Sequence, residues 1–75
     1  MLHAREDYNT TDLNAKIPAD EPVFLIRGQD FVGGDAVRAW ALLHEQAGGD
    51  PAMSQIARNH ADRMDRWPKK KLADM

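Results

Sequence analysis

Residues 23–30 place the strongest constraint on how this chain can fold. They begin with four consecutive apolar residues, a run typical of a β-strand that is covered on both faces. No second strand of this quality is evident elsewhere in the 75 residues. A lone strand leaves backbone hydrogen-bonding groups unpaired along both edges. The sequence therefore predicts that another copy of the chain pairs with it.

The size and composition of the chain also favour assembly. A domain of this length buries only about 60% of its unfolded surface, so small domains usually need a disulfide, a metal or an oligomer. The chain contains no cysteine, which excludes disulfides and thiolate metal sites. It has no run of about 18 apolar residues and no apolar signal core near its start. We therefore expect a homo-oligomer, a dimer or larger, in the cytoplasm and without a membrane partner.

A helix is predicted over residues 36–47. Asp35 is its expected N-cap, and Gly48-Gly49 ends it by allowing left-handed backbone angles. The expected apolar stripe consists of Ala36, Val37, Trp40, Leu43 and Ala47.

A second helix follows directly. Asp50 is its expected N-cap, Pro51 occupies its first turn and Pro68 ends it. The short link between the two helices predicts an antiparallel hairpin. Its expected apolar stripe consists of Met53, Ile56, Ala57, His60, Met64 and Trp67.

The predicted fold class is therefore α+β: one main strand, an antiparallel helical hairpin, and a sheet completed by oligomerisation. Residues 1–22 form an irregular arm, residues 23–68 the strand–helix–helix domain, and residues 69–75 a basic tail. Leu13, Ala15 and Ile17 alternate with polar residues. A short strand from this arm that pairs with the main strand is the alternative to assembly.

Charge is unevenly distributed along the chain. Residues 1–22 carry a net charge of −3, residues 23–57 carry −2 and residues 58–75 carry +3. The acidic start and the basic end are either solvated surfaces or a source of attraction between subunits.

The polar end of the strand supplies the main candidates for ligand binding. Arg27 and Gln29 share one face and Asp30 follows them, while Arg38 in the first turn of the next helix is expected to converge on them. Arginine binds carboxylate or phosphate through a planar fork, and glutamine can bind a base edge. Tyr8 is the candidate for stacking on a base. The alternative is that Arg27 pairs with Asp30 or with a neighbouring subunit.

No catalytic set is evident. Gly28 and Gly33 have the spacing of a phosphate loop, but Gly34-Asp35 follows where Lys and Ser or Thr are required. His3, His44 and His60 do not have the spacing of a zinc site. We therefore expect a protein that is not an enzyme and needs neither a metal nor a cofactor.

Three stretches carry a family resemblance: residues 20–30 (DEPVFLIRGQD), 36–41 (AVRAWA) and 64–67 (MDRW). Together they resemble a set of short accessory proteins from tailed-phage genomes. Short phage proteins often act against bacterial defence, and some are homo-oligomers that bind nucleotide immune signals between subunits. The resemblance implies a role of this kind in the cytosol of a host bacterium.

The leading functional prediction is a non-enzymatic protein that sequesters an anionic, nucleotide-like molecule at a subunit interface. One alternative is an inhibitor or adaptor that binds a host protein through the strand edge or the second helix. The other is a nucleic-acid binder that uses the basic end, with Lys69, Lys70 and Lys71 as contacts.

Overall fold

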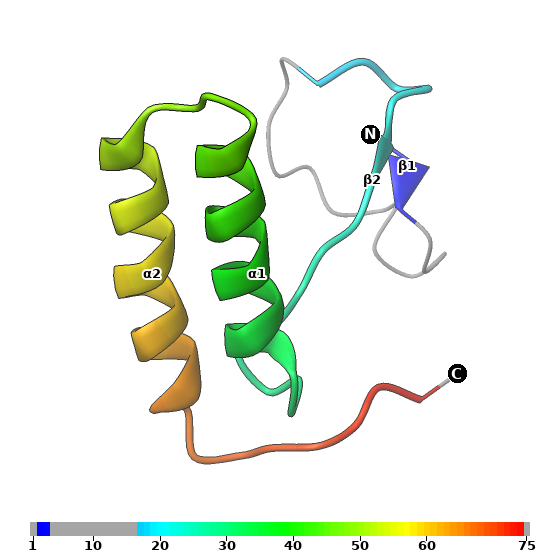
Figure 1. Cartoon of the computed structure of the whole chain (residues 1–75). Coiled ribbons are helices and arrows are strands. Elements are labelled where there is room, and N and C mark those ends of the chain that lie inside the picture. Colours follow the sequence, from blue (N-terminus) through cyan, green and yellow to red (C-terminus); the bar gives the residue numbers. More distant parts are fainter. Residues whose placement is uncertain (1, 4–16, 75) are drawn as a thin grey trace.

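The computed structural model describes residues 2–3 and 17–74 of the chain. Its elements, in order, are β1 (Leu2–His3), β2 (Pro22–Val23), α1 (Gly33–Gln46) and α2 (Pro51–Asp65). The two helices lie side by side, and the segment that carries β2 descends beside α1 and leads into its first turn (Figure 1). Neither helix has the length and apolar character required to cross a membrane, a finding limited to the described residues.

The antiparallel hairpin predicted from the sequence is confirmed. α2 begins after Asp50, whose side chain accepts a hydrogen bond from the backbone N–H of Ala52 at 2.9 Å. Pro51 occupies the first turn, where its missing N–H costs nothing. Gly48 has a φ of 88°, a left-handed angle that glycine adopts without strain and that reverses the chain between the helices.

The start of α1 differs from the prediction. The helix begins at Gly33 with Val32 as its N-cap, so Asp35 lies in the first turn and does not cap it. Asp30 takes part in the turn that leads into the helix: its carboxylate accepts a hydrogen bond from the N–H of Val32 at 3.0 Å, and its carbonyl accepts one from Gly33 at 2.9 Å. An upstream aspartate therefore supports the first turn, as Asx motifs do.

The two helices meet along a seam of small residues. Ala41 of α1 and Ser54, Ala57 and Ala61 of α2 are buried. The hydroxyl of Ser54 donates a hydrogen bond to the carbonyl of Ala41 at 3.3 Å. A Cβ added at Gly34 would lie 3.2 Å from the carbonyl oxygen of Ala61 and would collide with the carboxylate of Asp65. The two backbones therefore approach more closely than large side chains would allow.

This seam corrects the predicted apolar stripes. Of the stripe expected on α2, only Ala57 and Met64 are buried, whereas Ile56 remains 60% exposed. On α1 the expected core residue Trp40 is 45% exposed. Because small side chains fill the contact, the larger apolar groups are displaced to its sides. The spacing identified amphipathic helices correctly but assigned the wrong side chains to the contact.

The predicted strand over residues 23–30 is also wrong. β2 contains two residues, which pair in parallel with β1 in the register Leu2↔Pro22 and His3↔Val23. Residues 24–27 are irregular, and among them Leu25 and Ile26 are half-buried. A strand extends only where a neighbour supplies ladder hydrogen bonds, and β1 supplies two residues.

The oligomer-completed sheet was predicted from a long unpaired edge, and β2 is too short to provide one. The alternative strand at residues 13–17 lies, apart from Ile17, outside the described residues.

The basic tail returns to the body of the protein. Its backbone forms a parallel bridge between Asp30 and Lys71. The N–H of Phe31 donates to the carbonyl of Lys71, and the N–H of Lys71 donates to the carbonyl of Gln29, both at 2.8 Å. In Figure 1 this segment runs below the helices toward the residues that precede α1. The contact brings residues about 40 positions apart in the sequence to one place.

Candidate binding site

The docked tail encloses a small cavity against the loop that precedes α1. Its volume is about 50 Å³. Three of the side chains predicted to bind a ligand, Arg27, Gln29 and Asp30, line this cavity. The remaining lining residues are Phe24, Leu25, Lys71 and Ala73.

The lining carries two cationic side chains and one carboxylate. Arg27 is exposed, and no ion pair involving it is found in the described part of the chain. The ammonium of Lys71 lies 3.1 Å from the carboxylate of Asp74. Asp30, which also lines the cavity, is already engaged by the N–H of Val32. Guanidinium, ammonium and amide groups around one cavity suit a phosphate or carboxylate ligand.

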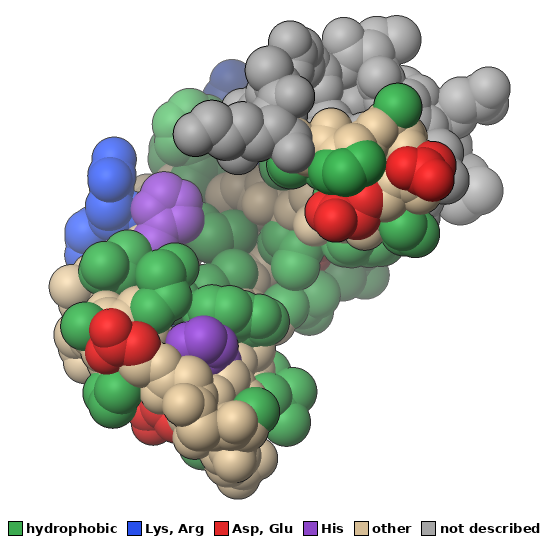
Figure 2. Space-filling model, turned by 90° about the horizontal axis from the view of Figure 1, so that it is seen from above, with side chains coloured by type: hydrophobic (Ala, Val, Ile, Leu, Met, Phe, Trp, Pro, Cys, Tyr) green, Lys and Arg blue, Asp and Glu red, His purple; other side chains and the backbone are tan. Residues whose placement is uncertain are grey.

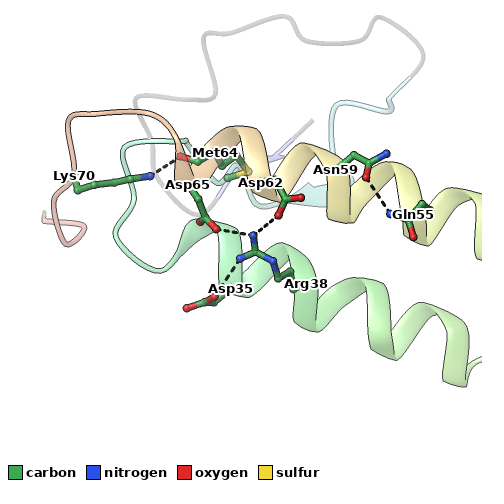
Figure 3. Close-up of polar contacts among 8 residues, drawn as sticks. All are labelled: Asp35, Arg38, Gln55, Asn59, Asp62, Met64, Asp65 and Lys70. Carbon is green, nitrogen blue, oxygen red and sulfur yellow. Dashed lines mark hydrogen bonds and ion pairs between the residues drawn. The ribbon is translucent and has the colours of Figure 1, made fainter.

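Arg38 does not line this cavity. Its guanidinium lies between the helices, 2.7 Å from the carboxylate of Asp62, 2.5 Å from that of Asp65 and 3.3 Å from that of Asp35 (Figure 3). The hydrogen bonds that Arg38 donates to Asp65 and Asp62 raise the pKa of Arg38 above its ordinary value. The expected convergence of Arg38 with Arg27 is therefore not found, because three carboxylates hold Arg38 at the hairpin.

A second ion pair lies on the same side of the hairpin. Arg58 of α2 and Glu45 of α1 are 2.8 Å apart, and both side chains are about one-third exposed. The hydrogen bond from Arg58 lowers the pKa of Glu45. We call the residues of these two clusters the ion-pair flank: Asp35, Arg38, Glu45, Arg58, Asp62 and Asp65.

The other predicted contacts have separate positions. Tyr8 lies outside the described residues. The ammonium of Lys70 donates to the carbonyl of Gly28 at 2.7 Å and to that of Met64 at 2.5 Å, so it fastens the tail to the end of α2. Lys71 forms the bridge described above, and Lys69 is exposed. The three lysines therefore do not form one uniform exposed patch.

Four residues that line the cavity were not predicted to bind a small ligand: Phe24, Leu25, Lys71 and Ala73. Phe24 was assigned to a strand covered on both faces, but its side chain is 68% exposed beside the cavity. Lys71 was assigned to the basic tail as a possible nucleic-acid contact, and its contact with residues 29–31 is long-range. No local signal reports such a contact.

A larger groove lies on the opposite side of the hairpin from the ion-pair flank. It encloses about 450 Å³ and is open to solvent. Figure 2 shows hydrophobic side chains along the hollow between the helices and the segment that carries β2. No group of three potential metal-binding side chains is found among the described residues. The groove is lined by Val37, Met53, Ile56, Ala57, Asn59, His60 and Arg63.

Comparisons of the chain with protein-family models, curated proteins and solved structures find no significant match. The geometry of the cavity and of the groove therefore carries the functional argument.

Proposed function

We propose that the protein is a non-enzymatic binding protein that holds an anionic, nucleotide-like small molecule at the cavity formed by the tail and the loop before α1. The observation that carries this proposal is the gathering of Arg27, Gln29 and Lys71 around one cavity. These side chains come from two distant parts of the sequence, and a pair of backbone hydrogen bonds holds them together.

The size of the cavity limits which part of a ligand enters it. A volume of about 50 Å³ gives room for roughly three to five water molecules, since one water needs about 10–15 Å³ of such space. This suits a single phosphate or carboxylate group. The rest of the ligand then lies at the surface beside Phe24, which is 68% exposed.

Sequestration is the mode of action that fits such a site. A protein that binds without turnover lowers the free concentration of its ligand in proportion to its own abundance. The resemblance to phage accessory proteins supports a nucleotide immune signal of the host as the molecule removed. Cyclic dinucleotides and ADP-ribose derivatives are the ligand classes to test first.

Isothermal titration calorimetry of the full chain against those compounds, with inorganic phosphate as the simplest probe, tests the proposal. We expect one nucleotide class to bind and Arg27→Ala or Lys71→Ala to weaken it by about tenfold or more, as for lost hydrogen bonds to charged groups. Arg66→Ala is the matched control, because Arg66 is exposed and does not line the cavity. No heat with any compound, or equal loss in the control, contradicts the proposal.

A further inference from the structure

Lys70 binds two separate segments of the protein, although its side chain does not line the cavity. Its ammonium donates one hydrogen bond to the carbonyl of Gly28 at 2.7 Å and another to the carbonyl of Met64 near the end of α2. Figure 3 shows the side chain extended from the tail toward Met64. A lysine ammonium has three donors and no acceptor, so one group can hold two carbonyls at once. Lys70 therefore joins the tail, the loop before α1 and the hairpin at one point.

The bond from Lys70 to Gly28 connects the two segments that form the cavity. In the tail, Lys70 directly precedes Lys71, which lines the cavity. In the loop, Gly28 lies between Arg27 and Gln29, which also line it. The bond therefore fixes how far the ammonium of Lys71 lies from the polar side chains of the loop.

The bond to Met64 ties the same contact to the helical hairpin. The carbonyl of Met64 lies in the last turn of α2, where unpaired carbonyls carry partial negative charge and attract cations. A Cβ added at Gly28 would lie 3.5 Å from the Cβ of Trp67 and 3.8 Å from the Cα of Met64. The loop therefore already lies against this end of the hairpin, and the ammonium of Lys70 adds the tail to it.

We infer that Lys70 is a positioning residue for the binding site: it docks the tail against the loop, and the cavity forms only while the tail is docked. The inference rests on the proposed function, because it concerns affinity at the same cavity. If only a fraction of the molecules has the tail docked, the apparent dissociation constant rises by the inverse of that fraction. By the same linkage, an anion that contacts both Arg27 and Lys71 favours the docked tail.

Amide hydrogen exchange, followed by NMR on the isotope-labelled full chain, tests the docking without ligand. Lys70→Met keeps the aliphatic side chain and removes the ammonium. Lys69→Met is the matched control, because it removes the same charge from a neighbouring exposed lysine that does not line the cavity. The amides of Phe31 and Lys71, whose hydrogen bonds join the tail to the loop, are expected to exchange about tenfold or more faster in Lys70→Met. The amide of Ala61 in α2 is expected to keep its protection in both variants.

Titration with inorganic phosphate and with ADP-ribose, followed through the same amide signals, measures the consequence for binding. Lys70→Met is expected to raise the dissociation constant about tenfold or more relative to Lys69→Met. Lys70→Arg retains a cation with several donors and is expected to recover part of the loss. In the wild type, the bound anion is expected to slow exchange at Phe31 and Lys71 and to leave Ala61 unchanged.

The two measurements separate this inference from the proposed function. If neither compound binds the wild type, the proposed function fails, and the exchange rates without ligand alone decide whether Lys70 docks the tail. Unchanged exchange at Phe31 and Lys71 in Lys70→Met overturns the inference, as does an affinity equal to that of Lys69→Met. Loss of protection at Ala61 as well would show that Lys70 supports the whole fold, which also overturns it.

Discussion

One flank of the α1–α2 hairpin is closed by ion pairs, whereas the other leaves apolar side chains around an open groove. On the ion-pair flank, Arg38 bridges from α1 to two carboxylates of α2, and Glu45 meets Arg58. On the other flank, which carries Val37, Met53, Ile56 and His60 and which we call the apolar flank, Met53 and Ile56 are 45% and 60% exposed. Both flanks belong to the same two helices, so the difference arises from which side chains the seam displaces to each side.

The two flanks differ in how their side chains are engaged within the described part of the chain. The charged groups find partners within one chain, because long arginine side chains reach across the two backbones. Among the described residues, the larger apolar side chains Met53 and Ile56 lie beside the seam, because small residues already fill the contact between the helices. The ion-pair flank therefore joins the two helices, whereas the apolar side chains around the groove take no part in these ion pairs.

The largest expected effect comes from the seam on which both flanks depend. Ala61 is fully buried between the helices, so Ala61→Leu forces the backbones apart and is expected to destabilise the fold by about 1–3 kcal/mol. Separating the two helices also moves Arg38 away from the carboxylates of Asp62 and Asp65 and disrupts the groove, which Ala57 of the seam helps to line. Urea unfolding followed by circular dichroism measures the loss. The exposed Ala39→Leu is the control, expected within about 0.5 kcal/mol of wild type, and equal stability of both variants would show that the seam is not tight.

A smaller effect is expected from the ion-pair flank. Arg38→Met keeps much of the side-chain bulk but leaves three carboxylates close together, so the variant is expected to be less stable than wild type in low salt. Because the three carboxylates are largely exposed, added salt screens both their attraction to Arg38 and their mutual repulsion. The difference in stability between Arg38→Met and the wild type should therefore become smaller as salt is added. Thermal melts at low and high salt measure this. Arg66→Met is the control and should show no such salt dependence. If Arg38→Met remains equally destabilised in high salt, the loss arises from packing and not from charge.

The helical part of the fold was readable from the sequence because its signals are local. Asp50 and Pro51 mark the start of α2 by the capping chemistry of adjacent residues, and Gly48 supplies the turn. The same local spacing misassigned the contact, because it grouped Ile56 with Ala57, and only Ala57 is buried against α1. Periodicity does not report how closely the second helix approaches. That distance depends on Gly34 and Ala41, which come from another element.

The candidate cavity was predictable only in part. Arg27 and Gln29 were identified from their place at the end of an apolar run, and they line the cavity that the structure contains. The run itself is not a long strand, because the bonds that extend a strand come from distant residues. Lys71 reaches the cavity through backbone hydrogen bonds to Gln29 and Phe31. Such bonds have no side-chain signature, so a tail that folds back is indistinguishable in sequence from one that does not.

The smallest expected effect is a loss of stability at low pH that arises from the Glu45–Arg58 ion pair. The folded-state pKa of Glu45 is lowered, chiefly by the hydrogen bond from Arg58. The stabilisation from this shift is therefore present above the ordinary pKa of about 4.5 and is lost as the pH falls through the lower folded-state value. A double-mutant cycle of Glu45→Gln and Arg58→Gln, read from urea midpoints, should show favourable coupling at about pH 7 that decreases as the pH is lowered below the ordinary pKa of about 4.5. Coupling that does not change with pH would mean that Glu45 and Arg58 interact through packing and not through charge. The two flanks of the hairpin would then not differ in the kind of interaction that their side chains make.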